Sequence, residues 1–503
     1  MTASPPAGRL GERMAAPPFG FLFDPNRCTG CAACALACSV ENELGWGRSW
    51  RQIVPFNAER RPGVPSFHLS LTCNHCADAP CVTHCPTGAM RRDASTGAVL
   101  VDDTRCIGCR YCAWVCPYDA PRFDEERGVM TKCTLCGHRL REGGSPACVE
   151  ACPTDALGFG PLVGAERIPG FPDTAAAPRI AFTPLRRDGA PPESSWSLPG
   201  NVLAAYAPDR VAQGRSDGSA QVTPAATGPV RPPRPWASNA ISFRSEAPLW
   251  LFTSGLAWLV GWIGAAAWGT VRAPLAGFLV LAGAALAVAL PHLGRPLGAW
   301  RALANLRASA LSREIAGTGA FLAATTLWLA WGGASASPVL PGAPGRVALA
   351  VLGGLATMLG LFALTAVDRV YRPVRARPGL DAADTLLTGP LVGAALLRSP
   401  WIFGALSALK LTLRIRRGGW QGLAGMVAMA LQLAAFAGPI ALWTLSPAAW
   451  PGWALLLVAG SDLVDRARLY RELTIPGPRL SAREETVGWV SRPRRRPDPR
   501  MAA

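Results

Sequence analysis

Sixteen cysteines, gathered in the first third of the chain, constrain its fold and chemistry more than any other feature. All of them lie between residues 28 and 152 of the 503-residue sequence. They form four groups, which are Cys28, Cys31, Cys34 and Cys38; Cys73, Cys76, Cys81 and Cys85; Cys106, Cys109, Cys112 and Cys116; and Cys133, Cys136, Cys148 and Cys152. Three residues separate the last two cysteines of every group, and a proline follows each of the last three groups.

Groups of four cysteines at this spacing are typical of iron–sulfur proteins. A [4Fe–4S] cluster needs four thiolates, and in two-cluster ferredoxins the last cysteine of a group binds the other cluster. Sixteen thiolates therefore predict four [4Fe–4S] clusters, with one [3Fe–4S] cluster as the remaining alternative. Disulfides suit secreted domains, but the first residues contain no apolar secretory segment. Structural zinc sites use C-x2-C pairs, not runs of four cysteines closed by a proline.

Three stretches around these cysteines resemble a known family. Thr72–Pro86, Arg105–Pro117 and Met130–Cys136 are similar to the four-cluster iron–sulfur subunit of the dimethyl sulfoxide reductase family of molybdoenzymes. The resemblance covers roughly residues 18–200 and implies that the first group pairs with the fourth and the second with the third. The implied ligand sets are Cys28, Cys31, Cys34 and Cys152; Cys133, Cys136, Cys148 and Cys38; Cys73, Cys76, Cys81 and Cys116; and Cys106, Cys109, Cys112 and Cys85.

Other polar residues of this region are expected to support the clusters rather than bind iron. The cysteines already satisfy the irons, so four histidines are interpreted as polar neighbours: His68, His75, His84 and His138. Lys132 and Arg110 lie beside expected ligands. A cation there would raise the reduction potential of a cluster, and an ordinary solvated charge is the alternative.

The chain is strongly positive, with a net charge of +17, and almost all of the positive charge comes from arginine. A nucleic-acid-binding protein would be one explanation. However, the arginines lie mainly between apolar spans, which is typical of a membrane protein with its positive loops on one side. We therefore expect a lipid bilayer, and no nucleic acid, among the partners.

Composition divides the chain into five regions. We expect a disordered tail at 1–17, a tandem ferredoxin-like domain at 18–160, an extended linker or wrapping arm at 161–245, a membrane domain at 246–470 and a basic cytoplasmic tail at 471–503. The predicted fold class is an α+β ferredoxin-like four-cluster iron–sulfur domain joined to an all-α polytopic membrane bundle of about eight helices. Short strands are expected at Phe19–Phe23 and Ala98–Val101.

Six apolar stretches approach the roughly 20 residues that a helix needs to cross a bilayer. They are Pro248–Thr270, Leu275–Pro291, Ile315–Gly333, Val347–Val367, Gly422–Leu445 and Trp450–Val464. Two shorter stretches, Leu386–Leu397 and Trp401–Leu413, are interpreted as two weak spans, with a re-entrant pair or one bent helix as alternatives. We expect the longer spans to lack charged residues at mid-span, which argues against an ion-pumping subunit.

The membrane half also resembles the eight-helix anchor subunit of the same family. The residues that carry this resemblance are Glu246–Thr253, His292–Pro296 and Ser309–Ile315. It implies a natural fusion of two subunits that are usually separate. Most loop arginines follow even-numbered spans, so the positive-inside rule predicts a multi-pass protein of the inner (cytoplasmic) membrane with its iron–sulfur domain in the cytoplasm. The sulfite-oxidising relatives, which pass electrons to quinone, have a similar location.

The membrane half contains a single histidine, His292, at the end of the second span. A haem held by two histidines of this half is therefore not expected, and electrons would pass directly between a cluster and menaquinone or ubiquinone. Quinone chemistry also moves protons, so a titratable group is useful. The resemblance implies that His292 contributes to quinol binding, and Glu314 is the second candidate. Alternatively, His292 caps its helix and Glu314 pairs with an arginine. Arg313 and Asp368 are weaker candidates.

The predicted function is electron transfer. The chain has no pterin-binding domain, so we expect a separate molybdopterin-containing catalytic subunit, with this chain relaying electrons between it and the quinone pool. The chain would not act on the substrate itself. Sulfite oxidation is one hypothesis, and quinol-dependent reduction of dimethyl sulfoxide or another S- or N-oxide is the alternative. A third hypothesis is an anchor or assembly protein whose clusters only stabilise the fold.

Overall fold

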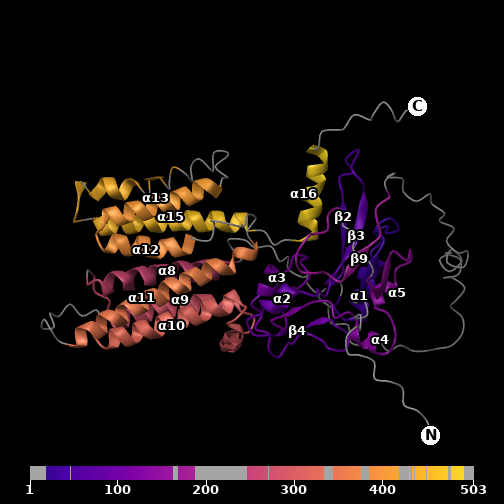
Figure 1. Ribbon diagram of the computed structural model, residues 1–503, viewed down its shortest axis with the longest axis horizontal. Helices are drawn as coiled ribbons and strands as arrows, with labels where there is room; N and C mark the ends of the chain where they lie inside the picture. The colour runs from indigo at the N-terminus through magenta and orange to yellow at the C-terminus, as the bar shows by residue number, and fades with distance from the viewer. Residues whose placement is uncertain are drawn as a thin grey trace, which may run out of the picture.

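The computed structural model describes six parts of the chain. They are residues 19–186 (except 46 and 163–167), 246–332 (except 270), 344–374, 384–417, 430–473 (except 431, 432, 435, 436, 444 and 449) and 477–491. Figure 1 shows two bodies, one of strands and short helices and one of long helices. The tail expected at 1–17 and most of the expected linker lie outside the described residues.

The first body, here called the cluster domain (residues 19–186), contains one small sheet and three hairpins. In the sheet, β1 (Phe19–Phe23) lies between β8 (Leu157–Pro161), which is antiparallel to it, and β9 (Ile180–Phe182), which is parallel to it. The hairpins are β2 (Gln52–Phe56) with β3 (Phe67–Leu71), β4 (Met90–Arg92) with β5 (Val99–Val101), and β6 (Arg122–Asp124) with β7 (Val129–Thr131). Strands therefore occur at both of the places that the sequence indicated.

Short helices of the cluster domain carry or adjoin the cysteines. They are α1 (Ala33–Glu41), α2 (Pro80–Thr83), α3 (Tyr111–Trp114), α4 (Gly137–Arg141) and α5 (Ala147–Glu150). A turn follows each cysteine–proline pair at Pro86, Pro117 and Pro153, because proline cannot continue the preceding helical hydrogen bonds. The domain core is aromatic, and Phe21 and Phe23, two residues apart in β1, point to the same buried face.

The cluster domain extends beyond the boundary expected at residue 160. Residues 180–182 form β9, in which Ile180 pairs with Phe21 and Phe182 with Phe23 of β1. Ile168 and Phe171 are buried in the same core. The proline- and alanine-rich composition of this stretch resembles a linker, but its few large apolar residues complete the sheet and its core.

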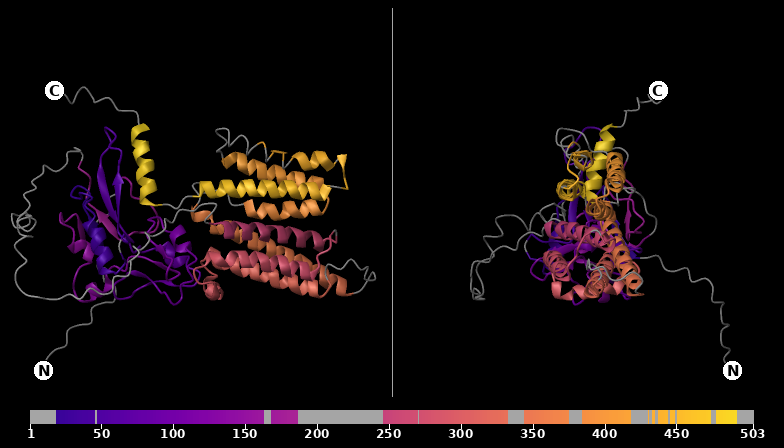
Figure 2. Two further views of the ribbon diagram at one scale, coloured as in Figure 1. Left: turned by 180° about the vertical axis from the view of Figure 1, so that it is seen from behind. Right: turned by 90° about the vertical axis from the view of Figure 1, so that its left-hand side faces the viewer.

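The second body, here called the helical body, contains long helices that run side by side (Figure 1). They are α8 (Ala247–Ala267), α9 (Leu275–Ala289), α10 (Ala310–Ala330), α11 (Pro344–Val370), α12 (Asp384–Leu396), α13 (Pro400–Arg417) and α15 (Trp450–Glu472). Between α9 and α10 lie two 3₁₀ helices, η1 (Leu290–His292) and η2 (Pro296–Asn305), and η3 (Arg372–Val374) follows α11. Figure 2 shows that the cluster domain meets only one end of this body.

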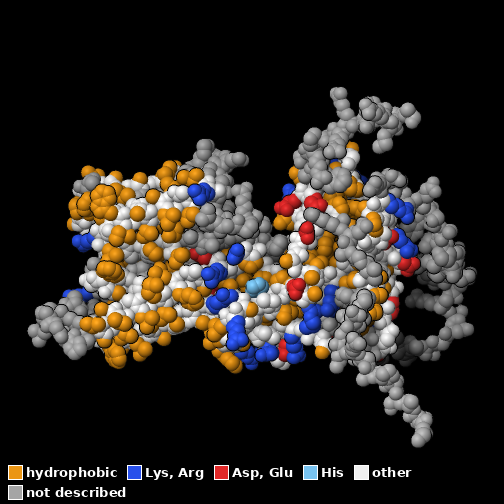
Figure 3. Space-filling model, viewed as in Figure 1, with side chains coloured by type: hydrophobic (Ala, Val, Ile, Leu, Met, Phe, Trp, Pro, Cys, Tyr) orange, Lys and Arg blue, Asp and Glu red, His pale blue; other side chains and the backbone are white. Residues whose placement is uncertain are grey.

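Three of the described helical segments are long and apolar enough to cross a membrane. They are Ala247–Ala267, Leu275–His292 and Val347–Val374. Shorter apolar helices occur at Thr385–Leu396, Pro400–Leu413 and Gly452–Leu463, so the two weak spans are separate helices rather than one bent helix. The span expected at 422–445 lies largely outside the described residues, and the total of eight stays a prediction. Hydrophobic side chains cover this body, whereas Lys and Arg gather where it meets the cluster domain (Figure 3).

A buried polar network joins several helices of the helical body. Asp462 of α15 accepts hydrogen bonds from Ser254 of α8 at 2.7 Å and from Thr388 of α12 at 3.1 Å. The Thr388 hydroxyl also accepts a bond from Lys410 of α13 at 2.9 Å. Both charged side chains are buried. Lys410 belongs to the short span Trp401–Leu413, and Asp462 lies two residues before the end of the span expected at Trp450–Val464. The expectation for the middle of the longer spans therefore stays a prediction.

The last described helix, α16 (Pro478–Ser491), packs against the cluster domain. It lies beside β2 (Figure 1), where the sequence indicated only a basic tail. Glu485 accepts a hydrogen bond from the backbone N–H of Gly170 at 3.0 Å. Ala482 is buried close to Gly170 and Phe56. Small and apolar residues on one face of α16 thus give this segment a docking surface that its net charge does not reveal.

Candidate functional site

The structure gathers the sixteen cysteines into four places, and all sixteen are free thiols. Thiols that interact electrostatically lie together: Cys28 with Cys31, Cys34 and Cys152; Cys133 and Cys136 with Cys38 and Cys148; Cys76 and Cys116 with Cys73 and Cys81; and Cys109 and Cys112 with Cys85 and Cys106. We call these the first, second, third and fourth thiol sets, in that order. Each set takes one cysteine from a distant group, so the first and fourth groups interlock, as do the second and third.

Left-handed backbone residues turn the cysteine loops. Ala32, Arg110 and Cys136 have φ angles of 63°, 59° and 48°, and they immediately precede α1, α3 and α4. Gly108, with a φ of 67°, provides a further left-handed turn in the third cysteine group. The chain therefore curls between successive cysteines, which is how thiols close in sequence face a common centre.

The second thiol set lines a cavity whose donors fit an iron–sulfur cluster. Cys38, Cys133, Cys136 and Cys148 border this cavity together with Arg51. Arg51 is buried, and its Nε and Nη2 atoms have no hydrogen-bond partner. In the described part of the chain, no three cysteine, histidine or acidic side chains converge closely enough to hold a single ion. Four thiols beside a cation with two unused N–H donors fit a larger group of net negative charge.

Burial makes these thiols hard to ionise without a metal. It raises the pKa of the Cys81 and Cys109 thiols to about 12. A cysteine ligand must be a thiolate, so metal binding releases these protons and is coupled to folding. The cysteine sets therefore need a cationic partner to become charged.

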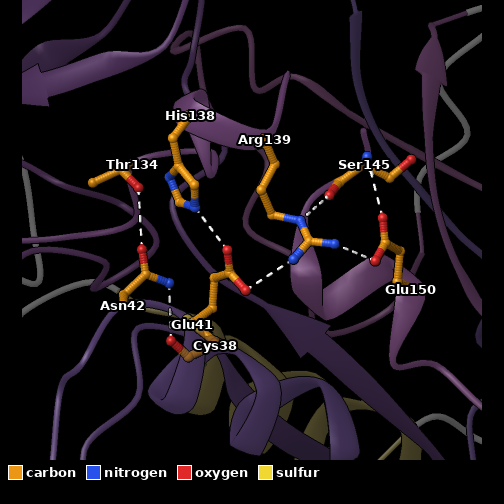
Figure 4. Close-up of polar contacts among 8 residues, drawn as sticks. All are labelled: Cys38, Glu41, Asn42, Thr134, His138, Arg139, Ser145 and Glu150. Atoms are coloured by element: carbon orange, nitrogen blue, oxygen red, sulfur yellow. Dashed lines mark hydrogen bonds and ion pairs between the residues drawn. The ribbon is translucent and has the colours of Figure 1, made fainter. Parts of the chain in front are cut away.

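A polar network braces the elements around the second thiol set (Figure 4). Glu41 at the end of α1 lies 2.7 Å from Nε2 of His138 and accepts a hydrogen bond from Nη1 of Arg139 at 2.9 Å. Arg139 also donates to Glu150 of α5 and, at 2.9 Å, to the carbonyl oxygen of Ser145. These contacts hold α1, which carries Cys34 and Cys38, against α4 and against α5, which carries Cys148.

The four thiol sets follow one another as neighbours, and this series is here called the line of thiol sets. Neighbouring sets interact through Cys34 and Cys148, through Cys133 and Cys73, and through Cys112 and Cys81. Cys31, in the first set, is exposed at one end of the line. At the other end, the carbonyl oxygen of Cys85 accepts a hydrogen bond from Asn305 of η2 at 2.9 Å. The fourth set therefore lies against the helical body.

The HLGRP stretch between α9 and η2 forms the junction of the two bodies. A Cβ atom on Gly294 would collide with the backbone of Gly128, so only glycine permits this approach. The backbone N–H of Arg295 donates to the carbonyl oxygen of Ile107 at 3.1 Å, and its Nη1 atom donates to that of Asp103 at 2.6 Å. The junction thus joins membrane loop and cluster domain backbone to backbone.

His292 lies at this junction, beside the fourth thiol set. Its Nδ1 atom is 3.3 Å from Oε2 of Glu246, although that oxygen accepts no hydrogen bond, and its ring interacts with the backbone of Cys109. The centre of the Trp114 ring system lies 6.4 Å from the centre of the His292 ring and 5.7 Å from that of the Tyr371 ring. The imidazole therefore lies among an acid, an aromatic ring and a cysteine loop.

Glu314 occupies a second buried position at the same end of the helical body. It lies near Tyr111 of the cluster domain and Asp368 of α11. Within the described residues Glu314 forms no ion pair, so the alternative of a pairing arginine finds no support there. Arg313 donates to the backbone carbonyl oxygens of Ser309 and Ala308.

Asp368 has a structural role in this region. Its two carboxylate oxygens accept hydrogen bonds from the backbone N–H groups of Thr385 and Leu386, at 3.2 and 3.1 Å. These residues belong to the first turn of α12, whose free N–H groups favour an acceptor. Asp368 therefore joins α11 to α12.

The histidines of the cluster domain make contacts within the protein. Nδ1 of His75 accepts a hydrogen bond from the backbone of Val99 at 2.9 Å. His84 packs edge to face on Tyr111, and the His68 ring lies against Gly30. Lys132 is buried, with its ammonium group on backbone carbonyl oxygens.

Four residues at these sites were missed by the sequence reasoning. They are Arg51 beside the second thiol set and Glu246, Trp114 and Tyr371 at the junction. Glu246 opens the EAPLWLFT stretch and could have been found as an acid at the start of an apolar span, as Glu314 was. Trp114 lies between two cysteines of one group. Arg51 and Tyr371 carry no comparable signal.

Two family descriptions match different parts of the chain. Residues 64–162 match the 4Fe-4S dicluster domain, and residues 247–378 match the dimethyl sulfoxide reductase anchor subunit (DmsC). The two matches fall on the two bodies of the structure, and the second includes His292, Glu314 and Asp368.

Curated relatives match the cluster domain. An anaerobic dimethyl sulfoxide reductase chain of Haemophilus influenzae is 44% identical over 153 residues, which are 29% of this protein and 74% of the relative. Its counterpart from Escherichia coli K12 is 42% identical over 174 residues, which are 33% of this protein and 84% of the relative. A sulfite dehydrogenase subunit of Allochromatium vinosum is 38% identical over 160 residues, or 28% and 67%.

Proposed function

The chain belongs to the family of iron–sulfur electron-transfer subunits of dimethyl sulfoxide reductase-like enzymes, with the anchor region fused to it, and on that premise we propose that it relays electrons between membrane quinone and a separate molybdopterin-containing catalytic subunit. The observation that carries this proposal is the line of four thiol sets. It begins at an exposed cysteine and ends at His292 against the helical body.

Each thiol set is proposed to hold one [4Fe–4S] cluster. Such clusters accept and release single electrons, at potentials set by charge, hydrogen bonds and exposure. The cavity beside Arg51 and the interlocking cysteine groups support this assignment. The chain's own residues position the clusters in sequence and exclude water from them, since most of the cysteines are buried.

The quinone site is proposed at the junction, with His292 and Glu314 as first expected and Glu246 added. Quinone reduction requires two protons with two electrons, so the ring oxygens need titratable neighbours. His292 and Glu246 lie 3.3 Å apart, and Glu314 is buried at the same end of the helical body. The cluster proposed for the fourth thiol set would be the one that exchanges electrons with quinone at this site. We propose menaquinone or ubiquinone as the diffusible partner.

The catalytic subunit is proposed to dock at the first thiol set. Cys31 is exposed there, and Leu36 and Val40 of the neighbouring α1 are 58% and 71% exposed. These two side chains are four residues apart and so share one face of the helix. An apolar ridge beside an accessible cluster site suits a protein partner that exchanges electrons.

We propose that the protein lies in the inner membrane with its cluster domain in the cytoplasm. The arginines of the α9–α10 loop, including Arg295 and Arg301, are on the same end as the cluster domain. We then propose sulfite as the substrate of the catalytic partner. One relative is named as a subunit of a sulfite dehydrogenase. Quinol-dependent reduction of an S- or N-oxide is the alternative, and components of dimethyl sulfoxide reductases are among the relatives.

Co-purification from native membranes through a C-terminal tag tests the proposal. The partner is identified, and turnover is assayed with sulfite plus a quinone analogue and with quinol plus dimethyl sulfoxide. We expect a molybdenum-containing partner and one of the two activities, which His292→Ala abolishes while iron content is kept. His68→Ala, in the cluster domain, is the matched control and should retain activity.

The two assays separate the substrates. Sulfite-driven quinone reduction supports a dehydrogenase module, whereas quinol-driven sulfoxide reduction supports a terminal reductase and contradicts the proposed sidedness. If no molybdenum-containing partner co-purifies, the relay is wrong and an anchor or assembly protein with structural clusters becomes the better interpretation.

A further inference from the structure

Arg51 is a buried cation that no carboxylate neutralises within the described part of the chain. It precedes β2, and its side chain is 2% exposed. Its Nη1 atom donates to the carbonyl oxygen and the hydroxyl of Ser70, at 3.0 and 3.2 Å. The guanidinium carbon lies 4.5 Å from the centre of the Phe21 ring. A buried charge is unfavourable unless it is paired, so Arg51 requires a negative partner.

The groups that face the guanidinium are thiols of two different sets. Cys34 belongs to the first set, and Cys38, Cys133 and Cys148 belong to the second; all four interact electrostatically with Arg51. Ser70, which Arg51 holds, is itself 3.2 Å from the sulfur of Cys34. The arginine therefore lies between the first and second sets.

Two donors of this arginine are unused by the protein. Nε and Nη2 are buried without a hydrogen-bond partner, although the side chain borders the cavity of the second set. An unmade hydrogen bond from a buried charged group is strongly unfavourable. The same fork of N–H groups is suited to anionic acceptors.

We propose that Arg51 sets the reduction potentials of the two clusters at the exposed end of the line, through its charge and its two unused N–H donors. This inference rests on the proposed function, because it requires clusters in the first and second thiol sets. A fixed positive charge and hydrogen bonds to sulfur both favour the reduced, more negative cluster. Arg51 is thus a tuning residue that binds no iron, unlike Lys132, whose ammonium group is occupied by carbonyl oxygens.

Potentiometric titration followed by electron paramagnetic resonance tests this inference on the full chain in native membranes. Arg51→Met removes charge and donors, and Arg51→Lys keeps the charge but loses the fork. In Arg51→Met we expect two of the four midpoint potentials to fall by about 59 mV. For a one-electron couple this corresponds to a tenfold lower equilibrium constant for reduction. A smaller fall of the same two is expected in Arg51→Lys. Arg61→Gln, an exposed arginine paired with Glu59 in the same hairpin region, should shift none.

Iron and acid-labile sulfide are measured in every sample. Full cluster content with four unchanged potentials, or four potentials that shift alike, overturns the role of Arg51 and leaves the relay intact. If Arg51→Met loses clusters, the Arg51→Lys variant decides between the two roles. Retained clusters with lower midpoint potentials at the same two clusters support the inference. Unchanged potentials or lost clusters in Arg51→Lys assign a purely structural role to Arg51. A wild-type chain that lacks the iron of four clusters would instead contradict the proposed function.

Discussion

Glu246 is a carboxyl group at the junction whose pKa lies near neutral pH. Burial raises the pKa of its carboxyl to about 7, and the charge of Arg110 opposes this rise. His292 from η1 and Arg110 from the cluster domain are the titratable and charged groups that face it. Because the folded pKa is raised, the stability that the protonated carboxyl contributes is lost as the pH rises through about 7.

Glu246→Gln should remove a proton carrier from the quinone site. The ionised carboxyl accepts a proton, so wild-type quinol oxidation should become faster as the pH rises through about 7. In the variant we expect this rise to vanish and the rate above neutral pH to fall about 100-fold. Stopped-flow reduction of the clusters by a quinol, over a series of pH values, measures both effects.

The exposed Glu126 provides the matched control, since Glu126→Gln should leave the profile unchanged. A Glu246→Gln protein that keeps the wild-type dependence on pH would assign proton transfer to another group.

At the scale of elements, hydrogen-bonded side chains join four helices of the helical body. Lys410 of α13 reaches Asp462 of α15 through the hydroxyl of Thr388 in α12, and Ser254 of α8 completes the network. Removing one charge of a buried network weakens the compensation of the opposite charge, which is more unfavourable than removing both charges.

Lys410→Met should therefore lower the free energy of unfolding by about 3 kcal/mol. Adding Asp462→Asn should restore part of the loss, because the two residues act as a unit. Thermal inactivation of the detergent-solubilised protein, followed by size-exclusion chromatography, compares the two variants. If the double variant loses as much stability as Lys410→Met, or more, the two charges do not interact.

The glycine contact between the HLGRP stretch and the β6–β7 hairpin sets how closely the two bodies approach. Gly294→Ala places a methyl group against the backbone of Gly128, so the interface must open. We expect a loss of about 1–3 kcal/mol in stability and slower reduction of the clusters by quinol. Gly354→Ala is the control, because a Cβ there meets no atom within 4 Å. Wild-type rates in Gly294→Ala would show that the contact is not needed for electron transfer.

At the scale of the whole molecule, a helix that follows the helical body in sequence packs on the cluster domain. α16 lies beside β2 (Figure 1), and η2 contacts the same domain near Cys85. Two segments distant in sequence therefore hold the cluster domain, and the η2 contact fixes the fourth thiol set against the helical body (Figure 2).

Removal of iron should loosen the cluster domain but not the helical body. The domain consists of short strands around buried thiols, and a cysteine that binds metal does so as a thiolate, which couples metal binding to folding. We expect limited proteolysis of the chelator-treated protein in native membranes to cleave within residues 19–186 first. Equal protection of the iron-free and the iron-loaded protein would contradict a folding role for the clusters.

Much of the site could be predicted from the sequence where the signal is local. The cysteine spacing indicated the metal chemistry, and runs of apolar residues indicated the helices, because both depend on neighbours along the chain. The edge of the cluster domain was missed, since β9 is recognisable only by its pairing with β1. Asp462 was missed because its partners lie on other helices.

By itself, the sequence determined the type and number of possible ligands, the presence of two domains of different character, and His292 as the single histidine of the membrane half. The tertiary structure alone decided which other side chains meet at these sites. Arg51 lies among thiols of two sets, and Glu246 meets His292 where α8 begins and η1 ends. The physical reason is that burial and electrostatic pairing depend on distances across the fold, which the order of residues along the chain does not contain.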